Sequence, residues 1–152
     1  MGLHGKLVAS IEFNAGGDVF HELLRYKPHQ ISTICPEIVK GCDLHEGEFS
    51  HVGSIICWNY IHYGKAKKIK EVIQLIDEEK RLIQFKVIEG DLMELYKDFV
   101  ITIHIEKNSG IDLVTTTFEY EMLNENVEHP ISNLSLVIDI IKAIETRHLA
   151  QP

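Results

Sequence analysis

Six strand-like runs follow one another through the central part of the chain, and only short turn segments separate them. The runs are 38–45, 53–62, 65–76, 81–89, 95–106 and 112–123. The intervals contain residues that favour turns, as in Tyr63-Gly64, Gly90-Asp91 and Asn108-Ser109-Gly110. Because parallel strands need a crossover of about a dozen residues or more, such short connections predict an antiparallel meander.

The segments before this meander predict one more strand and two short helices. Residues 6–13 alternate between two faces, as a half-buried strand does. Asp18 is placed to cap a short helix that Pro28 then terminates. A second short helix is expected over 29–34.

After Pro130 the apolar residues change to helical spacing. The side chains that recur on one helix face are Leu134, Val137, Ile138, Ile141, Ile144 and His148. Ser132 is placed to cap the start of this helix. The predicted order is therefore strand, two short helices, six strands and one long helix. We expect a single domain over residues 1–152, of the α+β class with a curved antiparallel sheet.

One helix is a narrow cover for so large a sheet, so a gap is expected between them, and apolar clefts of this kind usually bind small molecules. Alternation along each strand and helical spacing give the side chains expected to line the gap. They are Ile56, Trp58, Tyr60, Ile69, Glu71, Ile73, Ile83, Phe85, Val87, Phe99, Ile101, Ile103, Val114, Thr116, Phe118, Tyr120, Leu134, Ile138 and Ile141. Leu75 is expected on the same inward face. The alternative is that these side chains simply fill a core.

Glu71 is the most unusual member of this set. An ionised carboxylate on an apolar wall is costly, so its pKa should rise unless a cation pairs with it. In that position Glu71 could anchor a ligand hydroxyl or amine. The alternative is that a bulge turns Glu71 to solvent, where Lys68 or Lys70 pairs with it. The two tyrosines and the threonine of the set also need partners, from a ligand or trapped water.

The formal net charge of −8 argues against nucleic-acid binding, which needs clustered basic side chains. Lys65, Lys67, Lys68 and Lys70 do cluster, but they alternate with apolar residues and are interpreted as a solvated strand surface. We therefore expect a hydrophobic small molecule as partner and no nucleic acid. The sequence assigns no protein partner.

The sequence carries no signal-peptide pattern and no apolar run near the ~18 residues of a membrane span, so a cytoplasmic protein without stable membrane insertion is expected. Cys35, Cys42 and Cys57 are odd in number and lack Cys-x-x-Cys spacing, so neither a disulfide framework nor a metal site is expected. No cofactor is expected. If Met1 is removed, Gly2-Leu3-His4 offers a square-planar nitrogen set for Cu(II) or Ni(II); otherwise His4 is an exposed residue before a strand.

Several segments together resemble one family over essentially the whole chain. They are Pro28-His29-Gln30-Ile31-Ser32, Gly41-Cys42-Asp43-Leu44-His45-Glu46-Gly47, Gly53-Ser54, Trp58-Asn59-Tyr60, Gly64-Lys65, Ile76-Asp77-Glu78-Glu79-Lys80, Phe85-Lys86-Val87-Ile88-Glu89-Gly90-Asp91-Leu92, Tyr96-Lys97, Glu119-Tyr120-Glu121, Leu123-Asn124-Glu125 and Ile144-Glu145. They resemble the plant major latex protein-like proteins, a branch of the Bet v I-type, class-ten pathogenesis-related superfamily. The resemblance implies the helix-grip fold, with seven strands, two short helices and a long C-terminal helix around a hydrophobic cavity. It also implies carriage or sequestration of steroids, fatty acids or flavonoids in defence and stress.

The chain departs from the superfamily pattern at two places. The loop that is glycine-rich in relatives holds only Gly47 and Gly53, and Glu46 and Glu48 would repel a phosphate. Thr116 stands where close relatives often carry tryptophan, so more room is expected in the cavity.

Other functions of the superfamily fit less well. Related enzymes use a cavity lysine, which the predicted inward faces lack; an enzyme here would use Glu71 and tyrosines as acid–base groups. Ribonuclease activity has an acidic residue in Glu145, but Lys97 and Arg147 replace other expected residues. A hormone receptor would need a gate, and Tyr63-Gly64 is too short for one. We expect a carrier that is not an enzyme.

Overall fold

A computed structural model describes residues 3–108 and 110–150 of the chain. In this part of the chain, seven strands form an antiparallel sheet in the order β1-β7-β6-β5-β4-β3-β2. The strands are β1 (His4–Phe13), β2 (Val39–Glu46), β3 (Ile55–His62), β4 (Lys65–Asp77), β5 (Leu82–Gly90), β6 (Tyr96–Asn108) and β7 (Ile111–Met122). The helical segments are α1 (Gly17–Tyr26), η1 (Pro28–Gln30), α2 (Ile31–Ile34), η2 (Asp91–Glu94) and α3 (Ile131–Ala150). The predicted element order and the helix-grip fold are confirmed.

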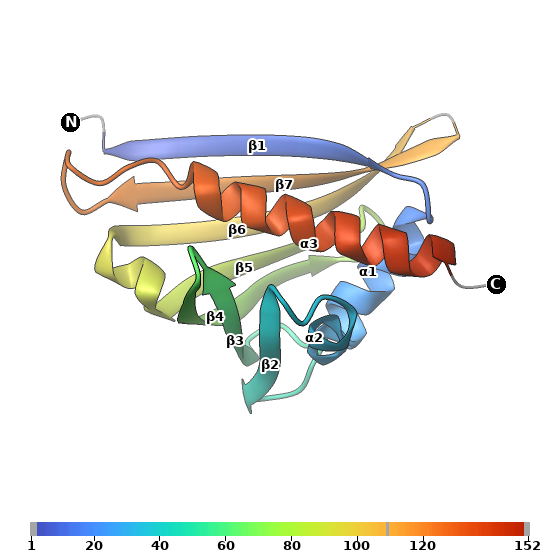
Figure 1. The fold of residues 1–152 in the computed structure, drawn as a ribbon, viewed down its shortest axis with the longest axis horizontal. Helices are drawn as coiled ribbons and strands as arrows, with labels where there is room; N and C mark the ends of the chain where they lie inside the picture. Colours follow the sequence, from blue (N-terminus) through green and yellow to red (C-terminus); the bar gives the residue numbers. More distant parts are fainter. Residues whose placement is uncertain (1–2, 109, 151–152) are drawn as a thin grey trace.

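Strands β2 to β7 pair in sequence order, as the short turns predicted, while β1 pairs with β7. In that pairing His4 lies opposite Glu121 and Phe13 lies opposite Asp112. Figure 1 shows α3 crossing one face of the curved sheet, with α1 and α2 at one end of that face. The helices therefore cover a single face, which makes it the inner one.

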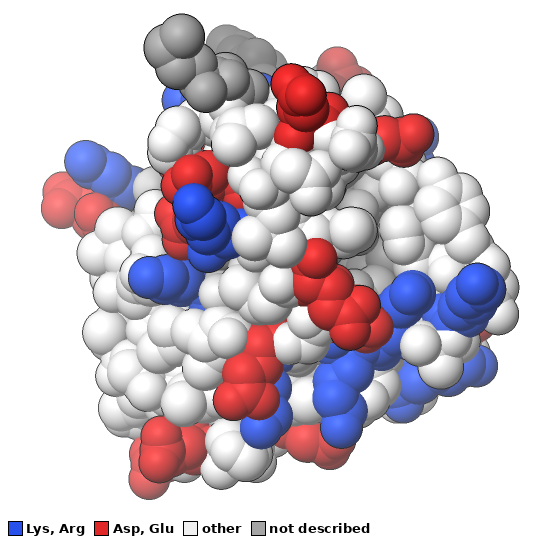
Figure 2. Space-filling model, turned by 90° about the vertical axis from the view of Figure 1, so that its left-hand side faces the viewer, with Lys and Arg blue, Asp and Glu red and all other residues white. Residues whose placement is uncertain are grey.

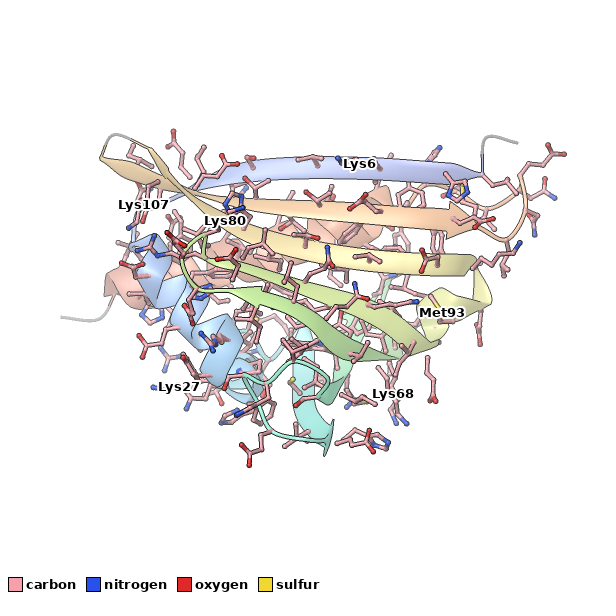
Figure 3. The ribbon with its side chains drawn as sticks, turned by 180° about the vertical axis from the view of Figure 1, so that it is seen from behind. Lys6, Lys27, Lys68, Lys80, Met93 and Lys107 are labelled. Atoms are coloured by element: carbon pink, nitrogen blue, oxygen red, sulfur yellow. The ribbon has the colours of Figure 1, made fainter. Side chains whose placement is uncertain are left out.

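Alternation along the strands separates the two faces of the sheet. The inner face contributes the most deeply buried side chains, among them Phe99, Val114 and Phe118. Figure 3 views the sheet from the opposite side, where Lys6 on β1 and Lys68 on β4 lie at positions that alternate with the inward ones. A sheet with one wet face and one covered face is typical of antiparallel architecture.

Neither predicted helix cap is correct. Helix α1 begins one residue before Asp18, and the backbone N–H of Gly17 donates to Asp112 Oδ2 at 2.8 Å. This bond is the main cause that lowers the pKa of Asp112 below its usual range. Asp18 instead pairs with Arg81. Ser132 lies inside α3, where its hydroxyl contacts His62. In both cases the side chain involved has its partner on a distant part of the sheet: Asp112 on β7 accepts from the first turn of α1, and the Ser132 hydroxyl contacts His62 on β3.

Leu75 is not on the inward face, and 45% of its side chain is exposed. The pairing of β4 with β5 shifts register between Ile73 and Leu75, which is the signature of a bulge. Ile76 packs against the core in its place. A one-residue shift reverses the faces of every later residue in a strand, so simple alternation fails beyond Ile73.

Candidate functional site

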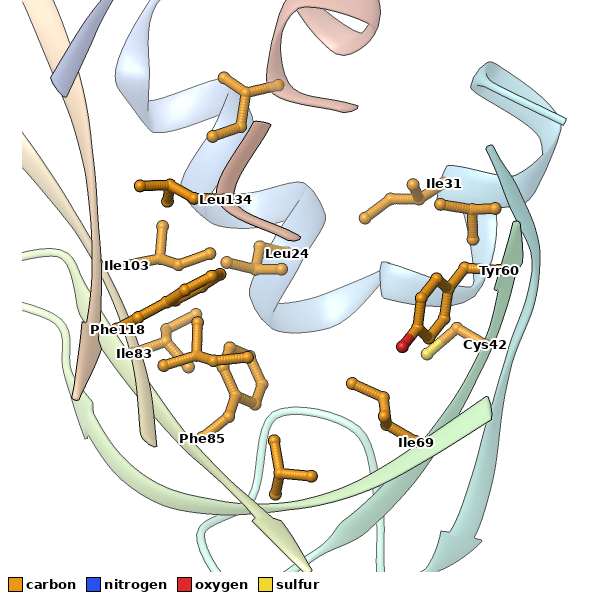
Figure 4. Packing of buried hydrophobic residues seen from close by; sticks show 14 of the residues in the cluster. Leu24, Ile31, Cys42, Tyr60, Ile69, Ile83, Phe85, Ile103, Phe118 and Leu134 are labelled. Carbon is orange, nitrogen blue, oxygen red and sulfur yellow. The ribbon is translucent and has the colours of Figure 1, made fainter. Parts of the chain in front are cut away.

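A cavity of about 130 Å³ lies between the inner face of the sheet and the helices. Its lining residues come from α1, α2, β2 to β7, η2 and α3. They are Phe20, Leu24, Ile31, Val39, Trp58, Tyr60, Ile69, Glu71, Phe85, Leu92, Phe99, Ile101, Ile103, Phe118, Asn133, Leu136, Val137, Ile140, Ile141 and Ile144. Figure 4 shows Ile69 and Tyr60 on one wall, with Phe85, Ile103 and Phe118 on the facing wall. The walls are almost wholly apolar.

Ten of the nineteen side chains predicted at the cavity line it. They are Trp58, Tyr60, Ile69, Glu71, Phe85, Phe99, Ile101, Ile103, Phe118 and Ile141. The other nine are inward or helix-face residues that do not reach it: Ile56, Ile73, Ile83, Val87, Val114, Thr116, Tyr120, Leu134 and Ile138. Helix α3 packs against β1 and β7, so side chains fill the space at that side of the sheet. The alternative, that these side chains simply fill a core, therefore holds for about half of the predicted set.

Ten lining residues are not among those predicted from the sequence. They are Phe20, Leu24, Ile31, Val39, Leu92, Asn133, Leu136, Val137, Ile140 and Ile144. Val137 and Ile144 belong to the predicted helical stripe, and Phe20 and Leu24 lie four residues apart on α1, so helical spacing could have found these four. No pattern in the sequence marks Asn133, because it is a polar residue among apolar ones.

Thr116 does not enlarge the cavity as expected. Its side chain is 1% exposed, and its hydroxyl has no hydrogen-bond partner among the described residues. Its neighbours across the sheet are Ala9 and Ile103, in the region where α3 contacts β1 and β7. Tyr120 also lies outside the cavity, where its hydroxyl and His129 Nδ1 are 2.5 Å apart.

Glu71 is the charged residue of the cavity wall, and its side chain is almost inaccessible to solvent, at 3% exposed. Trp58 Nε1 donates a hydrogen bond to Glu71 Oε1 at 2.7 Å. Within the described residues no cation pairs with this carboxylate. The alternative of a solvent-facing Glu71 is wrong, because this burial turns it inward, and Lys70 pairs with Glu89 instead, at 3.3 Å.

Burial raises the pKa of Glu71 to about 7, although the hydrogen bond from Trp58 acts in the opposite direction. Loss of hydration penalises the ionised form, and one N–H donor compensates for only part of that loss. Burial also raises the pKa of Tyr60 and of Cys42 well above their usual ranges. Glu71 is therefore the group at the cavity that changes charge near neutral pH.

Helix α3 is held to the rest of the fold near both ends. His62 Nε2 and Ser132 Oγ lie 3.0 Å apart, which joins the end of β3 to the first turn of α3. Burial and the nearby Lys67 lower the pKa of His62, so the imidazole is neutral at pH 7. Near the other end, the backbone N–H of Asn14 donates to the Glu145 carboxylate. The residues of α3 that line the cavity lie between these two attachments.

Removing the first attachment is expected to loosen the start of α3. Ser132→Ala loses one partly buried hydrogen bond, worth about 1 kcal/mol, so amide hydrogens in the first turns of α3 should exchange about fivefold faster. Hydrogen exchange followed by mass spectrometry measures this. Ser135→Ala changes an exposed serine of the same helix and should leave exchange unchanged. Equal exchange in the two variants would contradict the role of the His62 contact.

Two further features of the described residues bear on function. None of the helices in 3–108 and 110–150 is both long and apolar enough to cross a membrane, and no group of three or more metal-ligating side chains occurs there. The possible copper or nickel set at Gly2-Leu3-His4 includes Gly2, which lies outside the described residues. Figure 2 shows acidic and basic side chains intermixed on one face, with the basic ones most frequent along its lower right edge. The absence of nucleic-acid binding stays a prediction.

Solved structures share this arrangement of sheet and helices. The crystal structure of major latex-like protein 151 from Panax ginseng is 44% identical, covers 97% of this chain and 99% of its own, and superposes with a TM-score of 0.95. Norcoclaurine synthase from Thalictrum flavum covers 98% of this chain and 96% of its own, with a TM-score of 0.74. At 18% identity, that second similarity shows the fold alone.

Sequence comparison gives the same relationship. MLP-like protein 34 of Arabidopsis thaliana is 45% identical over 95% of this chain, which spans 46% of that relative, or about half its length. The family model described as the pathogenesis-related protein Bet v 1 family matches residues 2–151. The chain therefore belongs to the Bet v 1 family, and its similarity is to the major latex protein-like members.

Proposed function

We propose that the protein binds an apolar small molecule in the cavity between the sheet and α3, and carries or sequesters it. The observation that carries this proposal is a wall built from sixteen hydrophobic aliphatic and phenylalanine side chains around four residues with polar atoms, namely Trp58, Tyr60, Glu71 and Asn133. When an apolar ligand replaces water on such a surface, the free energy falls by about 25 cal/mol for each Å² of apolar surface that is buried. Since the family is described as pathogenesis-related, we place this binding in a defence or stress response.

The size of the cavity limits what it holds in this conformation. About 130 Å³ is close to the cavity of about 150 Å³ that binds benzene in an engineered protein. Drug-sized ligands occupy pockets of about 300–1,000 Å³. A steroid, fatty acid or flavonoid-like ligand, like the two-ring-system probe N-phenyl-1-naphthylamine, therefore requires a wider cavity, which displacement of the middle of α3 between its two attachments would provide.

A second candidate function is acid–base catalysis on a small molecule. Glu71 has the protonation behaviour of a general acid or base, because burial raises its pKa to about 7. However, the described cavity wall offers it no lysine and no second carboxylate, and a lone acid–base group contributes limited acceleration. We therefore propose binding as the function, and turnover of a bound compound would favour the enzyme.

Filling the cavity is expected to abolish binding. Ile101→Trp adds bulk at the cavity wall, so the affinity for the neutral fluorescent probe N-phenyl-1-naphthylamine should fall at least tenfold. Val100→Trp places the same side chain on the outer face of the same strand and should bind like the wild type. Fluorescence titration measures both. If the two variants bind the probe equally, the cavity is not the binding site.

Ile101→Trp strains a packed sheet, so circular dichroism must show that it folds. Val137→Trp fills the same cavity from α3 and provides an independent variant. Native mass spectrometry of protein purified from its own tissue then identifies the cargo. A stoichiometric apolar compound released on denaturation supports carriage. A protein that arrives empty and also takes up no probe contradicts it.

A further inference from the structure

The carboxylate of Glu71 faces the cavity without a counter-charge. Its Oε1 accepts the hydrogen bond from Trp58, and among the described residues no lysine, arginine or histidine forms an ion pair with either oxygen. Folding has therefore already removed most of the hydration of this group, which is 3% exposed. A cation that enters the cavity recovers electrostatic energy that water no longer supplies.

The aromatic residues of the wall favour the same kind of ligand. Trp58, Tyr60, Phe85, Phe99 and Phe118 all contribute to the cavity lining. The face of an aromatic ring attracts a cation within about 6 Å, most strongly where water is excluded. The remaining polar lining groups include two oxygen acceptors, the Tyr60 hydroxyl and the Asn133 amide oxygen, which suit N–H donors of a ligand.

We propose that the cavity selects an apolar molecule bearing a protonated amine, which forms an ion pair with the Glu71 carboxylate while its hydrocarbon part contacts the aromatic wall. This inference rests on the proposed function and names the chemistry of its ligand. A carboxylate ligand is disfavoured, because two like charges would share an apolar space. A neutral ligand that carries only a carbonyl would bind the protonated form of Glu71 instead.

Glu71 is the group that makes this binding depend on pH. The titratable groups that face it are Tyr60 on β3 and Cys42 on β2, and burial keeps both protonated through neutral pH. The residues of β5, η2, α1, α2 and α3 at the cavity do not titrate. Lys67, two residues before Ile69 on β4, is partly exposed.

The experiment compares benzylamine with benzyl alcohol, which has the same size but no charge. With the pKa of Glu71 at about 7, ionised Glu71 is about 30 times more populated at pH 8 than at pH 5.5, so benzylamine affinity should rise about 30-fold between these pH values. Benzyl alcohol should change less than threefold. Calorimetry at pH 6 in two buffers of different ionisation enthalpy should detect release of nearly one proton per benzylamine bound.

Two matched variants separate the charge of Glu71 from its shape. Glu71→Gln should lose at least tenfold in benzylamine affinity at pH 8, together with the pH dependence, while it keeps benzyl alcohol binding. Glu89→Gln removes an exposed carboxylate that pairs with Lys70 and should leave both ligands unaffected.

The outcomes distinguish this inference from the proposed function. Benzyl alcohol binding as tightly as benzylamine at pH 8, or benzylamine binding tighter at pH 5.5, overturns the amine preference while the proposed function stands. If benzylamine, benzyl alcohol and N-phenyl-1-naphthylamine all fail to bind, the proposed function fails and the amine preference fails with it.

Discussion

Between pH 5 and pH 8, the free energy of unfolding of wild-type protein is expected to fall by about 2 to 3 kcal/mol relative to that of Glu71→Gln. The pKa of Glu71 rises from 4.5 to about 7 on folding. Between these values the folded state holds one proton more than the unfolded state, so stability decreases as pH rises. The loss is complete above the folded pKa. Glutamine keeps the size of the side chain and the acceptor for Trp58, but it does not ionise.

Urea unfolding of both proteins across this pH range measures the effect, and the difference between the two curves removes contributions from other ionisable groups. The Glu89→Gln variant provides the control, because the Glu89 side chain is 65% exposed. Its curve should run parallel to that of the wild type. A wild-type curve that also runs parallel to the Glu71→Gln curve would mean that Glu71 titrates as an ordinary carboxyl.

Phe99→Ala is expected to destabilise the protein by about 3 to 5 kcal/mol, the usual range for a fully buried phenylalanine. Phe99 has no exposed surface. Its ring centroid lies 5.1 Å from Tyr96, 5.0 Å from Phe118 and 5.9 Å from Tyr120. The pairs with Tyr96 and Phe118 are edge-to-face and the pair with Tyr120 is stacked, and losing such aromatic pairs adds to the loss of buried area. Since Phe99 also lines the cavity, its removal enlarges an existing space that the surrounding strands cannot close.

Thermal or urea unfolding gives the loss of stability, and added benzene provides a second readout. An enlarged apolar cavity binds benzene, so benzene should restore more stability to Phe99→Ala than to the wild type. Tyr63→Ala removes an aromatic side chain that is 80% exposed and should cost no more than about 0.5 kcal/mol. A loss below about 1.5 kcal/mol for Phe99→Ala would show that the sheet collapses around the gap.

The fold followed from the sequence because its strongest determinants are local. Turn residues at short intervals fixed the meander, and the change to helical spacing after Pro130 located α3. The errors occurred where a residue distant in the chain decides the outcome. Asp112 on β7, rather than Asp18, satisfies the first turn of α1, and a bulge in the pairing with β5 turns Leu75 outward.

The cavity was only partly predictable for a related reason. Alternation identified the inward face, which places Glu71 and Trp58 correctly, but it does not say how closely a helix approaches each strand. The space remains open beside Ile69 and Phe85 and is filled around Thr116 and Val114. That difference depends on the path of α3 over the sheet, which no local pattern encodes.

The pairing of β1 with β7 has a consequence for how the protein is made. Strand β1 is synthesised before its partner, and His4 lies opposite Glu121, more than a hundred residues later in the chain. At about 5 to 20 residues per second, that partner is synthesised roughly 5 to 25 seconds after β1. Nascent chains therefore carry an unpaired strand and an uncovered apolar face while the residues between β1 and β7 are synthesised. We expect slow folding, late incorporation of β1 and dependence on chaperones until α3 has emerged.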